Sequence, residues 1–425
     1  MPQIASQINL IRFLVFSFPI AFMSIRHGVH LALYGTLLLF IYELSTTSCR
    51  LWTSKKSILI FGSLSSIFIA TALQQIITED FNLNAFDGPS RLLIAGMVFL
   101  YLRQKNINYF SIIEIAIPIG LIFLAICLQL NQKNFWGHRW ANNFVDPNSL
   151  GSQATILSLI CIFTIDVNSK KIISFLKLIG MLCGFYISIK AESRGGWSTI
   201  PAILACWLAI QIKNQSKFYS NKNSLIVILV TLFLLTAGLV TLVSMNDAIH
   251  NRISYTVFEI TTWFKDPTIY TSAGSRLSMW VASTRLIIEN PMGYGEISIK
   301  GIAAQHPLNF GIHQHGVKDL INAGPHSDIL SKGLSLGIFG IFSYLSLIFL
   351  PFFTFFKKIT SSSHSVRKAA QMGCIYIAGI FVAGLFNETL SLKYLCSFYG
   401  LMIACLAADV LRDNSHTLEL NQKVT

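Results

Sequence analysis

The chain has 425 residues, of which 53% are hydrophobic and only 12% are charged, and its mean hydropathy is +0.59. Soluble domains carry about 25% charged residues, so this composition excludes an ordinary soluble protein and indicates an integral membrane protein. The formal net charge is +13. Because the cytoplasmic loops of membrane proteins collect Lys and Arg, and because no basic stripe interleaved with aromatic residues occurs, we expect contact with membrane lipids and none with nucleic acid.

About twelve mostly apolar runs approach the length of about 20 residues that a helix needs to cross a bilayer. They fall near residues 8–24, 29–45, 57–75, 88–102, 109–129, 149–166, 172–190, 196–212, 224–244, 327–355, 369–387 and 393–411. The sequence therefore predicts an all-α polytopic membrane protein. We expect residues 1–425 to form a single integral membrane domain, within which residues 245–326 form one long hydrophilic loop.

The distribution of basic residues predicts the orientation of these spans. If the N-terminus is cytoplasmic, the loops on that side hold most of the Lys and Arg, and the opposite short loops hold fewer, among them Arg139 and Arg194. The positive-inside rule then places both termini in the cytoplasm and residues 245–326 on the outer side. None of the eight cysteines lies in that loop, and no cysteine or histidine pattern has zinc spacing, so we expect neither a disulfide nor a metal.

Charged residues that the topology rule does not explain are the best site candidates in such a protein. Arg194 follows Ser193 and precedes Gly195 and Gly196 at the turn between the seventh and eighth spans. A guanidinium group at the membrane edge can hold two phosphate oxygens, glycines allow a close approach of the backbone, and Ser193 is a suitable helix cap. The simpler interpretation is an interfacial arginine whose charge reaches water.

Arg276 is the second candidate. It opens a predicted amphipathic helix over residues 274–289, which Pro291, Gly293 and Gly295 are expected to end. We place Arg276 in the first turn, where the helix dipole disfavours a cation, so it is a better anion ligand than helix stabiliser. The alternative is a solvated loop arginine.

The third and fourth candidates lie where the chain re-enters and leaves the membrane. His326 can take up a proton near neutral pH, and Asp328 is a candidate to orient its ring, although a residue two positions away need not point the same way. The alternative is an ordinary histidine at a helix start. Asn387 and Glu388 stand at the outer end of the eleventh span, where Glu388 is either a site residue or a solvated helix-end charge. No Walker loop occurs, and no Asp-x-Asp that would hold a divalent metal stands on the outer side.

Four segments together resemble the superfamily of O-antigen ligases and polymerases. They are Phe144–Asn148, Ser193–Trp197, the series Arg276, Trp280, Pro291, Gly293 and Gly295, and His326–Leu330 followed by Gly337–Gly340. The resemblance covers residues from about 140 to 395, and its specificity lies in the order and spacing of these motifs around one outer loop. Ser327 and Ser335 depart from the usual Asn and Glu.

The resemblance implies a GT-C-type fold in the bacterial inner membrane and a metal- and cofactor-independent glycosyl transfer with inversion at the periplasmic face. Arg194 and Arg276 would hold the pyrophosphate of an undecaprenyl-pyrophosphate-linked glycan. Asn387 and Glu388 are further substrate-binding candidates on their position alone. His326 would deprotonate the acceptor hydroxyl. A ligase uses lipid A-core as the acceptor, and this is our first hypothesis.

Three alternatives remain open. A repeat-unit polymerase would use a second lipid-linked glycan as the acceptor. A protein O-oligosaccharyltransferase of the same superfamily usually has a larger C-terminal region. A transporter of lipid-linked glycans predicts paired repeats and charges at the membrane midplane, whereas the unexplained charges here gather at the outer face.

Overall fold

The computed structural model describes residues 2–46, 54–130, 139–166, 170–218, 247–295 and 314–412, and these contain α-helices, one 3-10 turn and no strand. The predicted all-α fold is therefore confirmed for this part of the chain. The elements are α1 (Pro2–Ala21), α2 (Gly28–Thr46), α3 (Lys55–Thr78), η1 (Leu83–Phe86), α4 (Asp87–Leu102), α5 (Tyr109–Leu130), α6 (Pro147–Phe163), α7 (Lys171–Ala191), α8 (Arg194–Trp197), α9 (Thr199–Phe218), α11 (Asp247–Lys265), α12 (Ser272–Glu289), α14 (Gln314–Ala323), α15 (Asp328–Phe356), α16 (His364–Phe386) and α17 (Lys393–Val410).

Within the described residues, nine helical segments are long and apolar enough to cross a membrane. They correspond to nine of the predicted runs. The runs at 8–24 and 149–166 are also helical, as α1 and α6, but their apolar helical parts are shorter than a full span. The run at 224–244 lies outside the described residues, so the total of about twelve spans stays a prediction.

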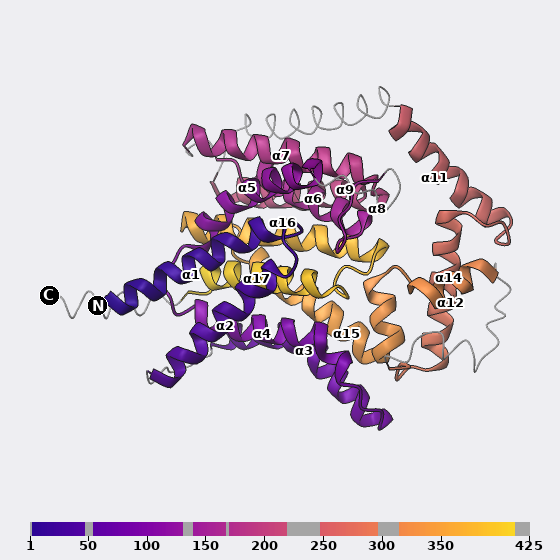
Figure 1. The fold of residues 1–425 in the computed structure, drawn as a ribbon, viewed down its shortest axis with the longest axis horizontal. Coiled ribbons are helices and arrows are strands. Elements are labelled where there is room, and N and C mark those ends of the chain that lie inside the picture. Colours follow the sequence, from indigo (N-terminus) through magenta and orange to yellow (C-terminus); the bar gives the residue numbers. More distant parts are fainter. Residues whose placement is uncertain are drawn as a thin grey trace.

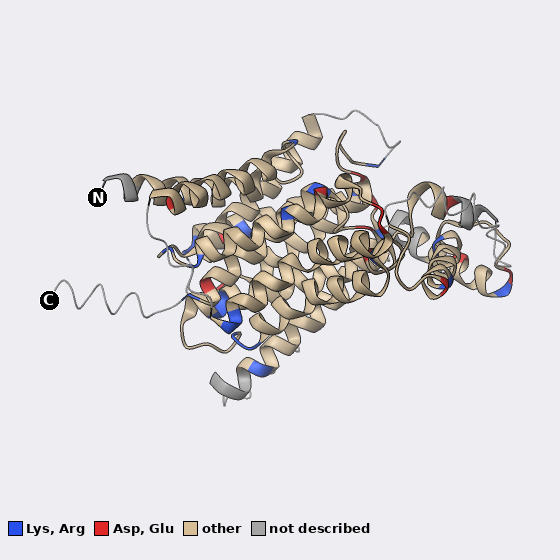
Figure 2. Ribbon diagram, turned by 90° about the horizontal axis from the view of Figure 1, so that it is seen from below, with Lys and Arg blue, Asp and Glu red and all other residues tan. Residues whose placement is uncertain are grey.

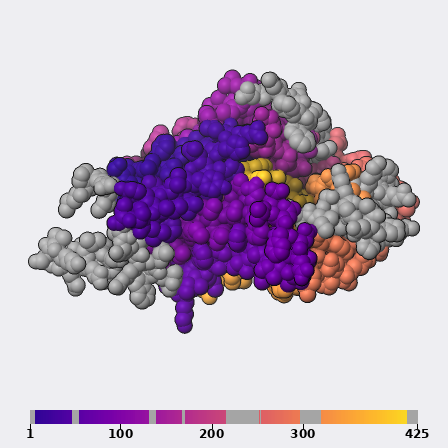
Figure 3. Space-filling view, turned by 60° about the horizontal axis from the view of Figure 1, so that its bottom comes forward, coloured from indigo at the N-terminus to yellow at the C-terminus, as the bar shows by residue number. Residues whose placement is uncertain are grey.

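Helix α17 is the central helix of the bundle. Every residue from Leu395 to Val410 is buried, including the polar side chains of Ser397 and Asp409. A helix that is apolar around its whole circumference is stable only when other helices surround it. Figure 3 shows this arrangement from one side, because the indigo and violet N-terminal helices cover that face and the yellow C-terminal segment is visible only as a small patch.

The described helices of the long hydrophilic loop gather at one end of the bundle. Figure 1 shows α11, α12 and α14 beside one another at the end opposite the start of α1. Figure 2 shows many of the Lys and Arg residues around that opposite end, whereas the middle of the bundle carries few charges. The ends of α7 and α16 and the starts of α6 and α15 face the α12 end, so loops from distant parts of the sequence meet there.

Helix α15 is interrupted at Gly337, whose φ of 61° and ψ of −145° are not helical. The segment from Pro291 to Gly295 supplies hydrogen bonds at this break. The backbone N–H groups of Tyr294 and Gly295 donate to Leu334 and Ser335, and Ile338 N–H donates to Pro291 O, at 2.8–2.9 Å. A Cβ on Gly337 would lie 2.0 Å from Pro291 O. Non-helical backbone is tolerated in a membrane protein where other protein groups satisfy it, and here they do.

Candidate functional site

The turn between α7 and α9 is built by local hydrogen bonds. Glu192 adopts a left-handed conformation with φ of 50°, which ends α7. Ser193 Oγ then accepts a hydrogen bond from Gly196 N–H at 3.1 Å and caps the short helix α8. The expected capping role of Ser193 is confirmed, although the capped helix is only four residues long. A Cβ on Gly196 would lie 2.9 Å from the Ser152 backbone, so the glycine allows α8 to contact α6 directly.

Arg194 reaches from α8 to helix α11. Its Nη1 atom donates to Glu259 Oε2 at 2.6 Å and to Thr256 Oγ1 at 2.8 Å. Glu259 is only 1% exposed, and its other carboxylate oxygen accepts the Ser272 backbone N–H at 2.9 Å, at the start of α12. A single buried carboxylate therefore connects Arg194, α11 and α12.

Arg139, which the sequence indicated only as a topology charge, lies beside the Arg194 turn. Its guanidinium donates to Ala191 O at 2.9 Å and to Asn148 Oδ1 at 2.7 Å. Asn148 is held in place because the Asp146 side chain caps α6 by accepting the N–H groups of Asn148 and Ser149. The Phe144–Asn148 segment thus positions an arginine beside the Arg194 turn, and only the tertiary structure reveals this.

Arg276 is the cation of this cluster that makes no hydrogen bond or ion pair to any described residue. Burial, followed by the nearby Arg194 and Arg139, lowers the pKa of Arg276 from its usual value, and Glu259 opposes the shift. An arginine stays protonated even so. Helix α12 begins at Ser272 after the Thr271 cap, so Arg276 lies in the second turn rather than the first. The expected position in the first turn was therefore wrong, and burial near other cations is the feature that favours Arg276 as a candidate anion ligand.

These three arginines line one cavity of about 350 Å³, which we call the arginine cavity. Its lining is shared between α6, α8, α11, α12 and the end of α16, and it includes Thr256, Trp280 and Asn387. The volume lies in the range of about 300–1,000 Å³ that is typical of small-molecule sites. With three guanidinium groups and one unpartnered, the cavity is suited to an anion with several oxygens.

His326 lies next to the arginine cavity but is not part of its lining. Trp280 Nε1 donates to Pro325 O at 3.1 Å and so joins α12 to the residue before His326. His326 has a left-handed backbone with φ of 49° and a hydrogen bond with the Asn387 side chain. Burial and then the Arg276 guanidinium lower the pKa of His326, while Asp146 and Asn387 oppose the shift. The imidazole is therefore neutral at pH 7 and can accept a proton.

The expectation that Asp328 orients His326 was wrong. The Asp328 side chain is fully buried, and both of its carboxylate oxygens accept the Leu390 backbone N–H, at 2.9 and 3.1 Å. A residue two positions along the chain, at the start of a helix, points away from the ring. Asn387 is the side chain that contacts His326 instead.

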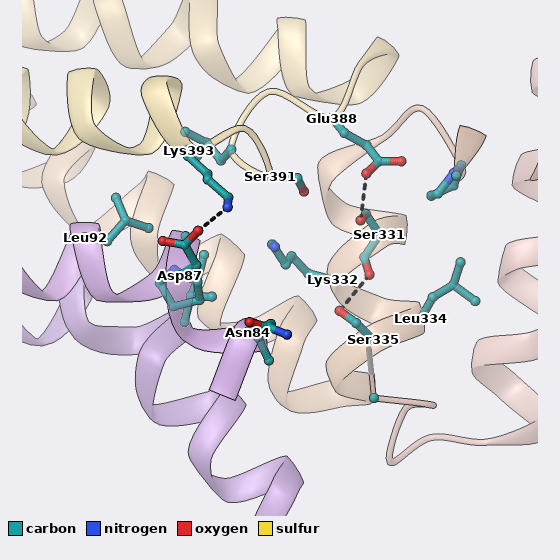
Figure 4. Close-up of a pocket in the computed structure, with 18 of the residues that line it drawn as sticks. Asn84, Asp87, Leu92, Ser331, Lys332, Leu334, Ser335, Glu388, Ser391 and Lys393 are labelled. Carbon is teal, nitrogen blue, oxygen red and sulfur yellow. Dashed lines mark hydrogen bonds and ion pairs between the residues drawn. The ribbon is translucent and has the colours of Figure 1, made fainter. Parts of the chain in front are cut away.

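Asn387 and Glu388 face different directions. Asn387 Nδ2 donates to Ser149 Oγ at 3.1 Å, and its side chain lines the arginine cavity. Glu388 accepts from Ser331 Oγ at 3.1 Å and lines a second cavity (Figure 4). Burial raises the pKa of Glu388 above its usual value, although Ser331, Lys332 and a hydrogen bond from the His326 backbone oppose the shift. Glu388 is therefore not the solvated helix-end charge that was the simpler interpretation.

The fold and the cavity define a multi-pass membrane protein with a cationic site at one end of its helix bundle. Residues 178–345 match the family model described as O-Antigen ligase. The match includes Arg194, Arg276 and His326, and it supports the resemblance to the superfamily of O-antigen ligases and polymerases. No curated protein matches the chain. No group of three or more His, Cys, Asp or Glu suited to a metal occurs in the described residues; the predicted independence from metals stays a prediction.

Proposed function

We propose that the chain is an O-antigen ligase, which transfers a glycan from undecaprenyl pyrophosphate to a hydroxyl group of lipid A-core at the periplasmic face of the bacterial inner membrane. The observation that carries the proposal is the convergence of Arg139, Arg194 and Arg276 on one cavity, beside a histidine that is neutral at pH 7. The family match supports glycan transfer in general. The choice of ligase over polymerase rests on the sequence resemblance alone.

The arginine cavity would hold the donor pyrophosphate. Arg276 has no anionic partner among the described residues, so it is ready to bind phosphate oxygens without first breaking an ion pair. Arg139 donates to the Ala191 carbonyl oxygen and to Asn148 Oδ1, and its side chain lines the same cavity. Preorganised cations stabilise the negative charge that develops on a departing pyrophosphate, and they make a metal ion unnecessary.

His326 would act as the general base. Its imidazole accepts the proton of the acceptor hydroxyl as that oxygen attacks the anomeric carbon of the donor glycan. The bond between the anomeric carbon and the phosphate oxygen breaks, and its electron pair leaves with undecaprenyl pyrophosphate. Attack on the side opposite the leaving group inverts the anomeric configuration. Asn387, which is hydrogen-bonded to His326 and also lines the arginine cavity, would fix the ring relative to the donor.

The same geometry suits the polymerase reaction, because only the acceptor differs. The concentration of Lys and Arg at the end of the bundle away from α12 supports an orientation in which the site is periplasmic (Figure 2).

Reconstitution into liposomes tests the proposal. The purified protein is supplied with an undecaprenyl-pyrophosphate-linked glycan and with either lipid A-core or an excess of the lipid-linked glycan alone. Transfer to lipid A-core is the expected result. Chain lengthening on undecaprenyl pyrophosphate would instead identify a polymerase, and the absence of both products would contradict glycan transfer.

A variant at the proposed base completes the test. His326→Ala is expected to abolish transfer, and His326→Asn should do the same while suiting the left-handed backbone at this position. His364→Ala is the matched control. His364 is largely exposed at the start of α16, contacts Asp166 and lines neither cavity. Monodisperse, thermally stable protein with full activity in either His326 variant would remove the base assignment.

A further inference from the structure

We propose that a second cavity, on the other side of His326 from the arginine cavity, binds the acceptor sugar, and that Lys332 contacts an anionic substituent on it. This inference rests on the proposed function, since it assigns the second substrate of the same reaction. The cavity has a volume of about 350 Å³. Its lining comes from η1 and the start of α4, from the start of α15 and from residues 388–393, and we call it the lysine cavity.

The polar groups of the lysine cavity resemble those of a sugar site rather than of a pyrophosphate site. Hydroxyl, amide and carboxylate groups from Asn84, Ser331, Glu388 and Ser391 line it, and no arginine is among its lining residues. Hydroxyl-rich sugars are bound by such donors and acceptors, whereas the arginine cavity presents guanidinium groups. The two cavities therefore differ in the chemistry that they offer.

Two polar atoms of this lining, Ser391 Oγ and Glu388 Oε1, are buried and have no hydrogen-bond partner among the described residues. The Glu388 carboxylate as a whole accepts hydrogen bonds from Ser331 Oγ and from the His326 backbone. Lys332 is half-buried and makes no hydrogen bond or ion pair to any described residue, and Figure 4 shows its side chain extending from α15 into the cavity toward Asp87 and Lys393. Buried polar atoms are normally paired, so these two atoms and the Lys332 ammonium around one cavity point to a polar ligand.

The charge balance favours a ligand with a negative group. Asp87 forms ion pairs with both Arg91 and Lys393, so a single negative charge is shared between two positive charges. Lys332 then adds a further positive charge. Lys332 acts on two other carboxyl groups: that of Glu388, whose pKa is raised by burial, and that of Asp328, which accepts the Leu390 N–H and does not line the cavity. A phosphate or carboxylate on the acceptor sugar would complete the pairing of Lys332.

The wall between the two cavities holds the proposed base. Gly324 and Pro325 line the lysine cavity, whereas Trp280, which donates to Pro325 O, lines the arginine cavity. In the same way, Glu388 lines the lysine cavity, whereas its neighbour Asn387 lines the arginine cavity. His326 follows Pro325 and bonds to Asn387, so it lies at the boundary, where a hydroxyl entering from one cavity can meet an anomeric carbon held from the other.

Photocrosslinking separates the two ligands by position. The photoreactive residue p-benzoylphenylalanine replaces Asn84, in the lysine cavity, or Ile260, in the arginine cavity; both side chains are exposed. Radiolabelled lipid A-core is expected to crosslink at position 84 and radiolabelled undecaprenyl-pyrophosphate glycan at position 260. Equal labelling of both positions by lipid A-core, or its labelling of position 260 alone, would overturn the assignment. This readout needs binding but no turnover, so it stands whether or not transfer is detected.

Kinetics with matched acceptors test the role of Lys332. Loss of a charged hydrogen bond predicts that Lys332→Met raises the KM for lipid A-core about tenfold or more. The KM for the donor should not change, and Lys332→Arg should restore much of the affinity. Lipid A-core dephosphorylated with hydrofluoric acid should bind wild-type protein and Lys332→Met equally well if the substituent is a phosphate, and should keep the difference between them if it is a carboxylate. Lys190→Met is the control, because Lys190 is exposed at the end of α7 and lines neither cavity.

These outcomes distinguish a failure of the proposed function from a failure of the role assigned to Lys332. A wild-type protein that transfers no glycan to lipid A-core or to a second lipid-linked glycan contradicts the proposed function. A wild-type protein that transfers glycan, together with an unchanged acceptor KM in Lys332→Met, contradicts only the role of Lys332. Should Lys332→Met not fold, Ser391→Leu narrows the same cavity and is expected to raise the acceptor KM without changing that of the donor.

Discussion

Glu259→Gln should strengthen donor binding. The Glu259 carboxylate occupies the Arg194 guanidinium at 2.6 Å, so a donor pyrophosphate must compete with it. If both anions contact Arg194 they lie about 5 Å apart, and at an effective dielectric constant near 20 their repulsion is about 3 kcal/mol per unit charge. Water in the open cavity reduces this value. Since about 1.4 kcal/mol corresponds to tenfold in affinity, we expect the donor Kd to fall about tenfold.

The substitution retains the local fold, because a glutamine oxygen can still accept the Ser272 N–H that Glu259 accepts at 2.9 Å. Equilibrium binding of a non-hydrolysable undecaprenyl-pyrophosphate analogue to protein in nanodiscs provides the measurement. Glu289→Gln makes the same charge change at the exposed end of α12, outside the cavity lining, and should leave the Kd unaltered. A Kd that stays the same or rises in Glu259→Gln would refute the reasoning, since Glu259 would then orient Arg194 rather than compete for it.

Two further substitutions have defined outcomes. Arg276→Gln removes a positive charge that lowers the pKa of His326, so the pKa of His326 should rise. The acid limb of the kcat–pH profile, measured at saturating donor, should therefore move to higher pH. If the limb does not move, His326 is not the titrating base. Gly337→Ala places a Cβ 2.0 Å from Pro291 O at a positive φ, and should destabilise the protein by about 3 kcal/mol or more. The thermal melting temperature in detergent measures this, and Gly62→Ala, where an added Cβ meets nothing within 4 Å, should not lower it.

Local features of the site were predictable from the sequence. The Ser193 cap depends on residues within three positions, so its sequence pattern is sufficient to reveal it. The apolar runs are equally informative, because the length and composition of a span do not depend on its neighbours. The end of the 274–289 helix before Pro291 follows from the same kind of local rule.

Contacts between distant residues were not predictable in this way. Glu259 lies on a helix that gave no functional signal, and only the packing of α11 against α12 brings its carboxylate to Arg194. Arg139 was counted with the topology charges because nothing in its neighbourhood shows that Asn148 and Ala191 will surround it. Asp328 illustrates the opposite error, since proximity in sequence suggested a contact that the start of α15 does not allow.

The hydrogen bonds between residues 291–295 and the interrupted helix α15 restrict how the protein can close around its substrates. They fasten the far end of α12 to the membrane-embedded framework through main-chain groups. Helix α12 therefore cannot swing open and shut as a rigid flap unless those groups lose their partners in an environment poor in water. Capture of a lipid-borne substrate must then rely on smaller adjustments, such as rotation of the Arg276 side chain or displacement of α11, while the end of α12 stays fixed against α15.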